Sequence, residues 1–496
     1  MRRFLFAALL LASPLPALAA DKPDGDKPAA DKAFDLPPFP ADKTVRQQAV
    51  IAGKPLAYDV TVGSIPVMDE HGKKIGEVMF TAYTVPNRGA AGRPVTFGFN
   101  GGPGASSAFL NLGAIGPKRI QFGAQGDTPS DPAVARDNPN SWLDFTDLVF
   151  IDPVGTGFSR SLEDEAGTKR DFYTAKTDIE YLSRVVFDWL TKNGRQTSPK
   201  FLIGESYGGY RVPRLAYYLQ SQLGVGLTGI TMVSPYLNPQ AIDDDENALS
   251  PLPYMVSLPS MTAANLERQG KLTGPAALAD VENYDRGEFA TDLFRGRSDP
   301  QAITRLTQKV SGYTGLDPAL VQRSEGRVSV RTFLREVHRN EAKIGSVYDS
   351  NVTAYDPFPA ASEQRSNDPI LDSIMAPTTG AAVDLITNQV GWKIQARYNL
   401  LSYDVNRLWN RDNSDAPVAD LRRAIAADPK MGVIIAHGMD DLSCPYFASR
   451  LIIDQMPAFG KAKPVNLELY PGGHMFYSRP ASAAQFRKDA MAMYLR

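Results

Sequence analysis

A serine flanked by small residues is the clearest sign of chemistry in this chain. The segment Gly204-Glu205-Ser206-Tyr207-Gly208 follows a short apolar run at 201–203 and precedes a helix-like segment at 210–223. Glycines two positions before and after a serine permit a tight strand-to-helix turn, because larger side chains would collide there. The pattern predicts that Ser206 is a nucleophile that attacks acyl carbons. The alternative is a solvated serine in a glycine-rich turn.

A nucleophilic serine needs a base, and the chain has only four histidines. His474 lies in a glycine-flanked loop after the last predicted strand, where an imidazole can reach over the edge of a sheet. His71 falls in a predicted hairpin turn and His338 in a helical region, so both are expected to be solvated surface residues. His437 is expected to be structural. His474 is therefore the predicted base.

Two adjacent aspartates compete for the third role. Asp440 and Asp441 lie in the loop that follows the penultimate predicted strand, at 431–436. An aspartate in this loop would hold the imidazole of His474 in one tautomer and stabilise its protonated form. Spacing alone does not choose between the two, since one could orient His474 while the other caps the next helix.

A glycine-rich segment offers a place for the charge that develops on an attacked carbonyl oxygen. Asn100-Gly101-Gly102-Pro103-Gly104 directly follows a predicted strand at 94–99. Without side chains, the backbone amides of such a segment can approach an oxyanion closely. The amides of Gly102 and Tyr207 are the predicted donors. The alternative is an ordinary turn of glycine and proline.

The hydrophobic pattern predicts the sheet that would bring these residues together. Apolar stretches at 56–62 and 78–85 flank the turn-like segment 69–72, which predicts antiparallel hairpins at one edge. Short apolar runs then alternate with segments of helical periodicity, such as 179–190, which predicts a mostly parallel sheet covered by helices. The predicted strands are 94–99, 147–151, 201–203, 230–233, 431–436 and 465–470.

This alternation stops between residues 239 and 388, where helix-like pieces such as 302–310 and 330–339 are joined by polar or proline-rich connections. We interpret this region as a helical cap inserted into a core formed by 45–238 and 389–496. The order of motifs and the strand-turn-helix at Ser206 are typical of the α/β-hydrolase fold. The expected architecture is a mostly parallel sheet with antiparallel N-terminal strands and a helical insertion.

The N-terminal residues have the pattern of a secretory signal. Arg2 and Arg3 precede a short apolar run at 4–12, and Ala17-Leu18-Ala19 resembles a cleavage site. We expect residues 1–20 to be removed and 21–44 to form a flexible tether. The protein would then be exported to the periplasm or the extracellular space, without stable insertion in a membrane.

Composition limits the other possibilities. The chain has 496 residues, a formal net charge of -2 and a single cysteine, Cys444. The charge gives no reason to expect a nucleic-acid partner, and no intramolecular disulfide can form. Motifs of zinc proteases, paired CxxC sites and phosphate loops are absent, so neither a metal nor an organic cofactor is expected.

Four ordered segments together resemble the serine carboxypeptidase family. They are Asn100-Gly-Gly-Pro-Gly-Ala-Ser-Ser107, Asp152-Pro-Val-Gly-Thr-Gly-Phe-Ser159, Gly204-Glu-Ser-Tyr-Gly-Gly-Tyr210 and Gly473-His-Met475. The resemblance implies that the acid is Asp441, with Cys444 in the position of a thiol found in some members. It also implies that the insertion corresponds to that family's cap domain.

The same resemblance implies a site for the substrate's terminal carboxylate, formed by the Asn100 side chain, the Gly101 amide and Glu205. Glu205 would have to be protonated, because two carboxylates repel whereas a carboxylic acid can donate a hydrogen bond. Substrate binding should then improve at acidic pH.

This sequence departs from the family pattern at three places. Ala114 stands where a second glutamate is common, and Gly98 stands where a tryptophan is usual. The family's Asp-Gln-Pro-Val segment is here Ile151-Asp152-Pro153-Val154.

The sequence therefore predicts a hydrolase that releases C-terminal residues from peptides through an acyl-enzyme on Ser206. A secreted esterase or acyltransferase with the same triad is the alternative, which Ala114 favours. A third possibility is a binding protein on a hydrolase scaffold. The expected partners are peptides or small acyl compounds, and the sequence does not indicate an oligomeric state.

Overall fold

The computed structural model describes residues 36–86, 92–120, 130, 134–242, 249–361, 367–411, 417–460 and 465–495. The predicted signal segment and most of the predicted tether lie outside these residues. The first strand begins at Lys43, so the last two residues assigned to the tether belong to the sheet.

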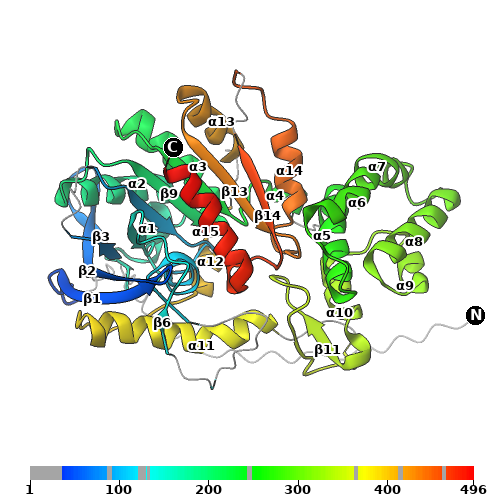
Figure 1. Ribbon diagram of the computed structural model, residues 1–496, viewed down its shortest axis with the longest axis horizontal. Coiled ribbons are helices and arrows are strands. Elements are labelled where there is room, and N and C mark those ends of the chain that lie inside the picture. The colour runs from blue at the N-terminus through cyan, green and yellow to red at the C-terminus, as the bar shows by residue number, and fades with distance from the viewer. Residues whose placement is uncertain are drawn as a thin grey trace, which may run out of the picture.

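A large central sheet organises the molecule (Figure 1). Its strands run in the order β1-β2-β3-β7-β4-β9-β10-β13-β14, and the short β8 pairs with β3. The first three strands are antiparallel to one another, and β3 is antiparallel to β7. From β7 to β14 all neighbours are parallel. The predicted combination of antiparallel N-terminal strands and a parallel sheet is confirmed.

The bounds of the strands agree with the hydrophobic pattern. The antiparallel strands are β1 (Lys43–Ile51), β2 (Lys54–Met68) and β3 (Lys74–Thr84). The parallel strands are β4 (Val95–Phe99), β7 (Asp147–Ile151), β9 (Lys200–Glu205), β10 (Gly229–Val233), β13 (Gly432–Gly438) and β14 (Asn466–Tyr470). Short strands are β5 (Lys118–Arg119), β6 (Arg136–Asp137) and β8 (Arg160–Ser161).

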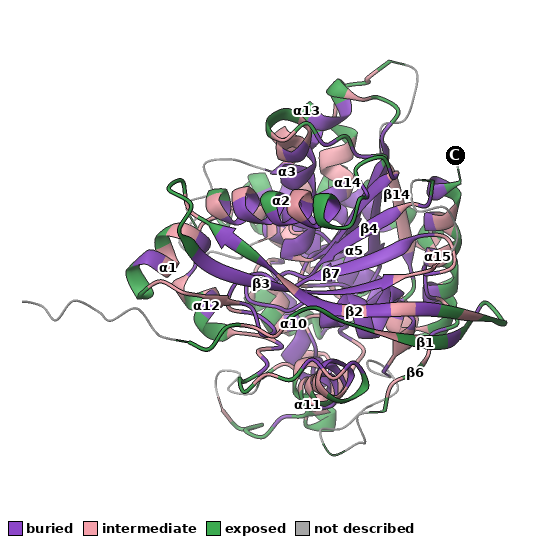
Figure 2. Cartoon of the chain, turned by 90° about the vertical axis from the view of Figure 1, so that its left-hand side faces the viewer, coloured by how far each residue is buried: buried purple, intermediate pink, exposed green. Residues whose placement is uncertain are grey.

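Helices cover both faces of the sheet, which explains why the central strands are continuous apolar runs. Every residue of β4, β7 and β10 is buried (Figure 2). Helices α2 (Ala175–Lys192), α3 (Tyr207–Gln222) and α13 (Pro417–Ala427) pack on one face. Helices α15 (Pro480–Tyr494) and α11 (Pro369–Val383) pack on the other.

The remaining helices outside the inserted segment are short. They are the π-helix η1 (Leu110–Ile115), α1 (Glu165–Phe172), α12 (Tyr403–Leu408), α14 (Tyr446–Asp454) and the 3₁₀ turn η6 (Phe476–Ser478). No helix among the described residues is both long enough and apolar enough to cross a bilayer.

Residues 239–388, here called the inserted segment, are mostly helical. They form α4 (Pro239–Ile242), α5 (Leu252–Arg268), η2 (Pro275–Leu278), α6 (Ala279–Tyr284), η3 (Asp285–Phe289), α7 (Ala290–Phe294), α8 (Pro300–Thr314), α9 (Pro318–Arg323), α10 (Val330–Glu336), η4 (Arg339–Glu341), α11 and η5 (Asp384–Gln389). A small hairpin joins β11 (Lys343–Gly345) to β12 (Thr353–Tyr355).

Packing divides the inserted segment into two parts. Helices α5 to α10 surround a hydrophobic core of their own beside the sheet, and Tyr446 and Phe447 of α14 contribute to that core. Helix α11 instead packs into the main core through Ile370 and Ile374. Figure 1 shows α5 to α10 on one side of the sheet and α11 running beneath β1.

Candidate active site

Ser206 occupies a strained turn between β9 and α3. Its φ and ψ are 60° and -121°, a conformation that costs energy for any residue with a side chain. A Cβ on Gly204 would lie 2.1 Å from the Gly208 carbonyl oxygen, and one on Gly208 would lie 2.2 Å from the Phe99 carbonyl oxygen. The two glycines are therefore required for this turn, which projects Ser206 above the ends of the parallel strands.

His474 and Asp441 meet in loops that follow neighbouring strands. The Nδ1 atom of His474 lies 2.8 Å from Oδ2 of Asp441, and both side chains are buried. The other oxygen of Asp441, Oδ1, accepts hydrogen bonds from the backbone amides of Ser443 and Cys444, at 2.8 and 2.9 Å. These bonds fix the carboxylate, so that it can hold the imidazole in one tautomer.

The environment of His474 affects its proton affinity in two directions. Burial by itself lowers the pKa of His474, but the charge and hydrogen bond of Asp441, together with Cys444, raise it well above its usual value. An imidazolium formed during a reaction would therefore be stabilised.

The segment after β4 packs directly against the turn at Ser206. A Cβ on Gly101 would lie 2.5 Å from the Tyr207 amide nitrogen, so only glycine allows this approach. Gly102 has a φ of +100°, which also favours glycine. Asp152 binds the backbone of this segment, since its Oδ1 accepts a hydrogen bond from the Ser107 amide at 2.7 Å. The backbone of Gly102 and Tyr207 is thereby brought beside Ser206.

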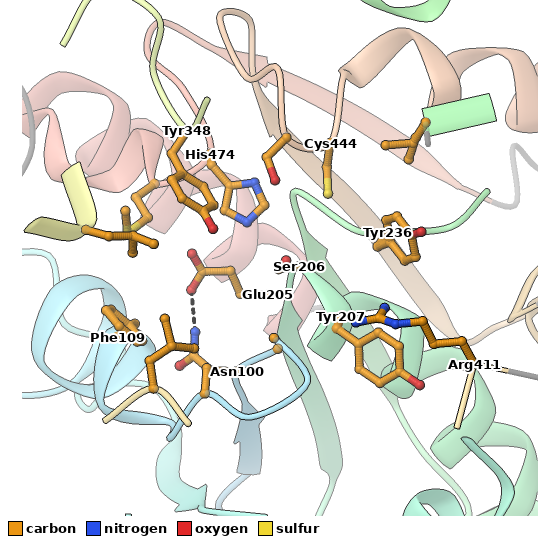
Figure 3. A pocket seen from close by; sticks show the side chains of 18 residues that line it. Asn100, Phe109, Glu205, Ser206, Tyr207, Tyr236, Tyr348, Arg411, Cys444 and His474 are labelled. Carbon is orange, nitrogen blue, oxygen red and sulfur yellow. Dashed lines mark hydrogen bonds between the residues drawn. The ribbon is translucent and has the colours of Figure 1, made fainter. Parts of the chain in front are cut away.

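Asn100 and Glu205 form a polar pair next to Ser206. The Asn100 side-chain amide donates to Oε2 of Glu205 at 2.7 Å (Figure 3). The Tyr477 hydroxyl lies 2.8 and 2.9 Å from the two carboxylate oxygens. Burial raises the pKa of Glu205, although His474 and the hydrogen bonds from Tyr477 and Asn100 oppose the shift. The raised pKa favours the protonated form.

One pocket of about 300 Å³ is lined by Ser206, His474, Asn100 and Glu205. Figure 3 shows the ring of His474 and the side chains of Ser206 and Glu205 facing the same hollow. The lining residues are Asn100, Gly101, Gly102, Ala105, Phe109, Glu205, Ser206, Tyr207, Tyr236, Ile242, Tyr348, Leu371, Leu401, Arg411, Ser443, Cys444, His474 and Met475. A serine hydroxyl, an imidazole, backbone amides and a buried carboxyl group therefore surround a cavity in which an acyl group could sit.

Comparison with known proteins identifies the family. A model described as serine carboxypeptidase matches residues 63–473. The chain belongs to the serine carboxypeptidase family. It is 31% identical over 215 residues to serine carboxypeptidase-like 36 of Arabidopsis thaliana, over 42% of this chain and 41% of that protein. It is 30% identical over 213 residues to the probable serine carboxypeptidase CPVL of Rattus norvegicus, over 40% of each chain. The matched region thus spans less than half the length of these relatives.

A solved structure supports the fold over a longer range. The prohormone-processing carboxypeptidase Kex1(Δ)p of Saccharomyces cerevisiae superposes with a TM-score of 0.55, covering 88% of this chain and 91% of that chain, at 16% sequence identity. At this identity the likeness shows the fold alone, and it confirms the predicted α/β-hydrolase fold.

Against this family background, Tyr477 is the residue that sequence reasoning missed. The motif comparison left Glu205 without a carboxylate partner, because the corresponding position is Ala114 in the buried helix η1. The structure provides a phenol from another part of the chain, three residues after His474. The lack of a second glutamate in the sequence indicates that Glu205 needs another hydrogen-bond partner, but it does not indicate which residue that partner is.

The structure contradicts one prediction, for His338, and one open alternative, for Asp440. His338 is buried, not solvated, and its Nε2 lies 3.1 Å from the Ser350 carbonyl oxygen. Asp440 does not cap the helix that follows. It is fully buried and points toward Arg479, whose Nη2 atom is 3.7 Å away.

The other two histidines match their predicted character. His71 is exposed in the turn between β2 and β3. His437 is buried, with Nε2 2.8 Å from the Ser449 hydroxyl. Burial, assisted by His474, lowers the pKa of His437 to about 3, so it remains neutral.

Three carboxylates outside the pocket lining, those of Glu267, Asp349 and Asp440, approach one another closely. Arg479 forms ion pairs with Glu267 and, at 2.8 Å, with Asp349. Burial and the neighbouring carboxylates raise the pKa of Asp440 well above its usual value. The guanidinium of Arg479 already supplies positive charge to the cluster, so these residues are poorly suited to hold a metal ion.

Proposed function

We propose that this protein is a serine carboxypeptidase that releases C-terminal residues from peptides. Ser206 is the nucleophile, His474 the general base and Asp441 the residue that orients it. The amides of Gly102 and Tyr207 form the oxyanion hole. The observation that carries the proposal is the convergence of Ser206, the His474–Asp441 pair and the buried Glu205 on one pocket.

In the proposed mechanism, the Ser206 hydroxyl attacks the carbonyl carbon of the last peptide bond and transfers its proton to Nε2 of His474. The oxyanion is stabilised by the two backbone amides. The carbon–nitrogen bond then breaks as His474 protonates the departing amine. Water, deprotonated by His474, hydrolyses the acyl-enzyme and restores Ser206.

Recognition of the C-terminus is assigned to Asn100, the Gly101 amide and protonated Glu205. A buried carboxylic acid can donate to the substrate carboxylate, whereas an ionised Glu205 would repel it. The raised pKa of Glu205 supports this role. His474 must be neutral to act as a base, and Glu205 must be protonated to bind the substrate carboxylate. We therefore expect a bell-shaped pH dependence of kcat/KM, whose two apparent pKa values describe His474 and Glu205 together.

The decisive experiment compares a blocked dipeptide acid with its amide and ester from about pH 4 to 8, a range that spans a raised glutamate pKa. We expect the free acid to be preferred at low pH and this preference to fall as Glu205 ionises. The ester should lack the decline at higher pH. Ser206→Ala should abolish all activity, and Ser373→Ala on α11, outside the pocket, should be neutral. An equal pH dependence for acid and ester would contradict the proposal.

A secreted esterase or acyltransferase is the second candidate. It is favoured by Ala114, which places no carboxyl group where many family members have a second glutamate. In the same experiment this candidate predicts the ester as the best substrate at every pH.

We also propose that the protein is exported, from the signal-like pattern of residues 1–20. N-terminal sequencing of the mature protein should begin at Ala20 or Asp21, whereas retention of Met1 in the cell extract would contradict export.

A further inference from the structure

The pocket has two chemically different ends, with Ser206 between them. Asn100 and Glu205 lie at one end (Figure 3). Tyr207, Tyr236 and Arg411 lie at the other, and the Arg411 side chain extends from its backbone toward Tyr207 (Figure 3). Among the described residues that line the pocket, Arg411 is the only arginine or lysine.

Hydrogen bonds through Asn406 connect Arg411 to the segment after β4. Its Nη2 donates to Oδ1 of Asn406 at 2.8 Å and approaches the Asn406 carbonyl oxygen at 3.4 Å. The side chain of Asn406 in turn donates to the carbonyl oxygen of Pro103, in the segment after β4, at 3.3 Å. Within the part of the chain that the structure describes, the acceptors of Arg411 are therefore uncharged, and its other guanidinium hydrogens remain for a further acceptor.

The backbone before Arg411 is also anchored. Trp409 is buried, and its indole nitrogen donates to the Tyr207 hydroxyl at 3.2 Å. The backbone amide of Asn410 donates to the Tyr173 carbonyl oxygen at 2.8 Å. These contacts hold the start of the arginine side chain beside the turn at Ser206, although Arg411 itself is exposed at the pocket mouth.

The direction in which a peptide binds determines which of its residues contacts Arg411. If the terminal carboxylate binds at Asn100 and Glu205, the scissile carbonyl lies over Ser206. The residue before the scissile bond must then extend to the opposite end, where Tyr207, Tyr236 and Arg411 lie. A guanidinium recognises a carboxylate through paired hydrogen bonds, and the tyrosine rings can pack on the side-chain methylenes.

We propose that Arg411 is a specificity-determining residue that selects substrates with aspartate or glutamate immediately before the scissile bond. The inference deepens the proposed function and rests on it for the direction of the peptide. The leaving C-terminal residue lies at the other end of the pocket and is not selected by Arg411.

The test compares kcat/KM for N-blocked dipeptides that differ only in the first residue: glutamate, glutamine or lysine. We expect glutamate to exceed glutamine by about tenfold, as for a charge-assisted hydrogen bond in a pocket open to solvent. In Arg411→Gln this ratio should fall to about one, because the charge is lost. Arg411→Glu should favour lysine. Arg407→Gln is the matched control, since Arg407 is an exposed arginine of the same segment paired with Asp404.

Ethyl esters of the same blocked amino acids separate this proposal from the proposed function. They require acylation of Ser206 but carry no terminal carboxylate. A preference for the glutamyl ester that disappears in Arg411→Gln supports the inference even if free carboxylates prove unimportant. An unchanged ratio in Arg411→Gln, with the variant shown to be folded by its Tm, would overturn it. No glutamate preference in the unmodified protein would also overturn it.

Discussion

The loops at the carboxyl ends of the parallel strands and the inserted segment both contribute to the position of His474, but in different ways. Loops after β9, β13 and β14 carry the side chains proposed to react: Ser206, Asp441 and His474. The inserted segment carries none of these, yet it binds the backbone of His474. The Tyr348 carbonyl oxygen accepts the His474 amide at 2.5 Å, and Asp349 Oδ2 accepts the Gly473 amide at 3.1 Å.

Further contacts connect the inserted segment to these loops. The Leu442 amide, next to Asp441, donates to the Val347 carbonyl oxygen at 3.1 Å. Arg479 joins Asp349 to Glu267 on α5. The loops that follow the strands therefore carry the groups proposed to react, whereas residues 347–349 of the inserted segment bind the two loops that carry Asp441 and His474.

The largest effect is expected at the closest contact between the two regions. In Gly473→Ala, the new Cβ would lie 1.8 Å from the Tyr348 carbonyl oxygen. The loop must shift away from the inserted segment, so we expect at least about a hundredfold loss of kcat, since small misplacements of a catalytic group have this effect. Overpacking should also destabilise the fold by about 1–3 kcal/mol. Steady-state kinetics and denaturant unfolding measure both effects.

Gly312→Ala is the matched control. Gly312 lies in α8 of the inserted segment, and a Cβ there would meet nothing within 4 Å. Alanine should stabilise this helix by about 0.5–1 kcal/mol and leave kcat unchanged. Full activity in Gly473→Ala would show that the close contact is irrelevant to catalysis.

A smaller effect is expected from Asp349, which acts only through the loop. Asp349→Ala removes the acceptor of the Gly473 amide and one partner of Arg479, so we expect kcat to fall about tenfold with little change in KM. Asp349→Asn keeps an acceptor for the amide and should restore part of kcat. The steady-state parameters of both variants check this.

Asp317→Ala separates catalysis from stability. Asp317 caps α9 in the same segment, so its loss should cost about 1 kcal/mol of stability with no change in kcat. If the two alanine variants lose kcat equally, the inserted segment contributes general stability and does not position His474.

The difference between the sheet and the inserted segment also explains which features of the structure can be predicted from the sequence. Strands buried on both faces are continuous apolar runs, so β7 was predicted at its observed bounds, and the glycines around Ser206 follow from local sterics. Contacts between distant segments have no such local pattern. Tyr348 and Asp349 lie between two short strands, and only packing of the inserted segment places them against Gly473.

His338 and Asp440 also show that local sequence does not reveal tertiary contacts. His338 and Asp440 are polar residues in loops or at a helix end, which favours an exposed or capping role locally. Tertiary packing buries both instead, His338 against Ser350 and Asp440 beside Arg479. The sequence did distinguish Asp441 through family resemblance, and the bond between Asp441 and His474 is consistent with that choice.

The smallest effect is expected on the sheet side, at Tyr477. Its hydroxyl stabilises the ionised form of Glu205, so Tyr477→Phe should raise the Glu205 pKa further. A group with a raised pKa remains protonated to higher pH, so KM for a peptide acid should begin to increase at a higher pH than in the unmodified protein. The kcat for an ester should change little, because His474 and its contacts with the inserted segment are untouched. A shift of the KM profile to lower pH, or an equal loss of ester activity, would show that Tyr477 supports the fold of the loop and does not tune Glu205.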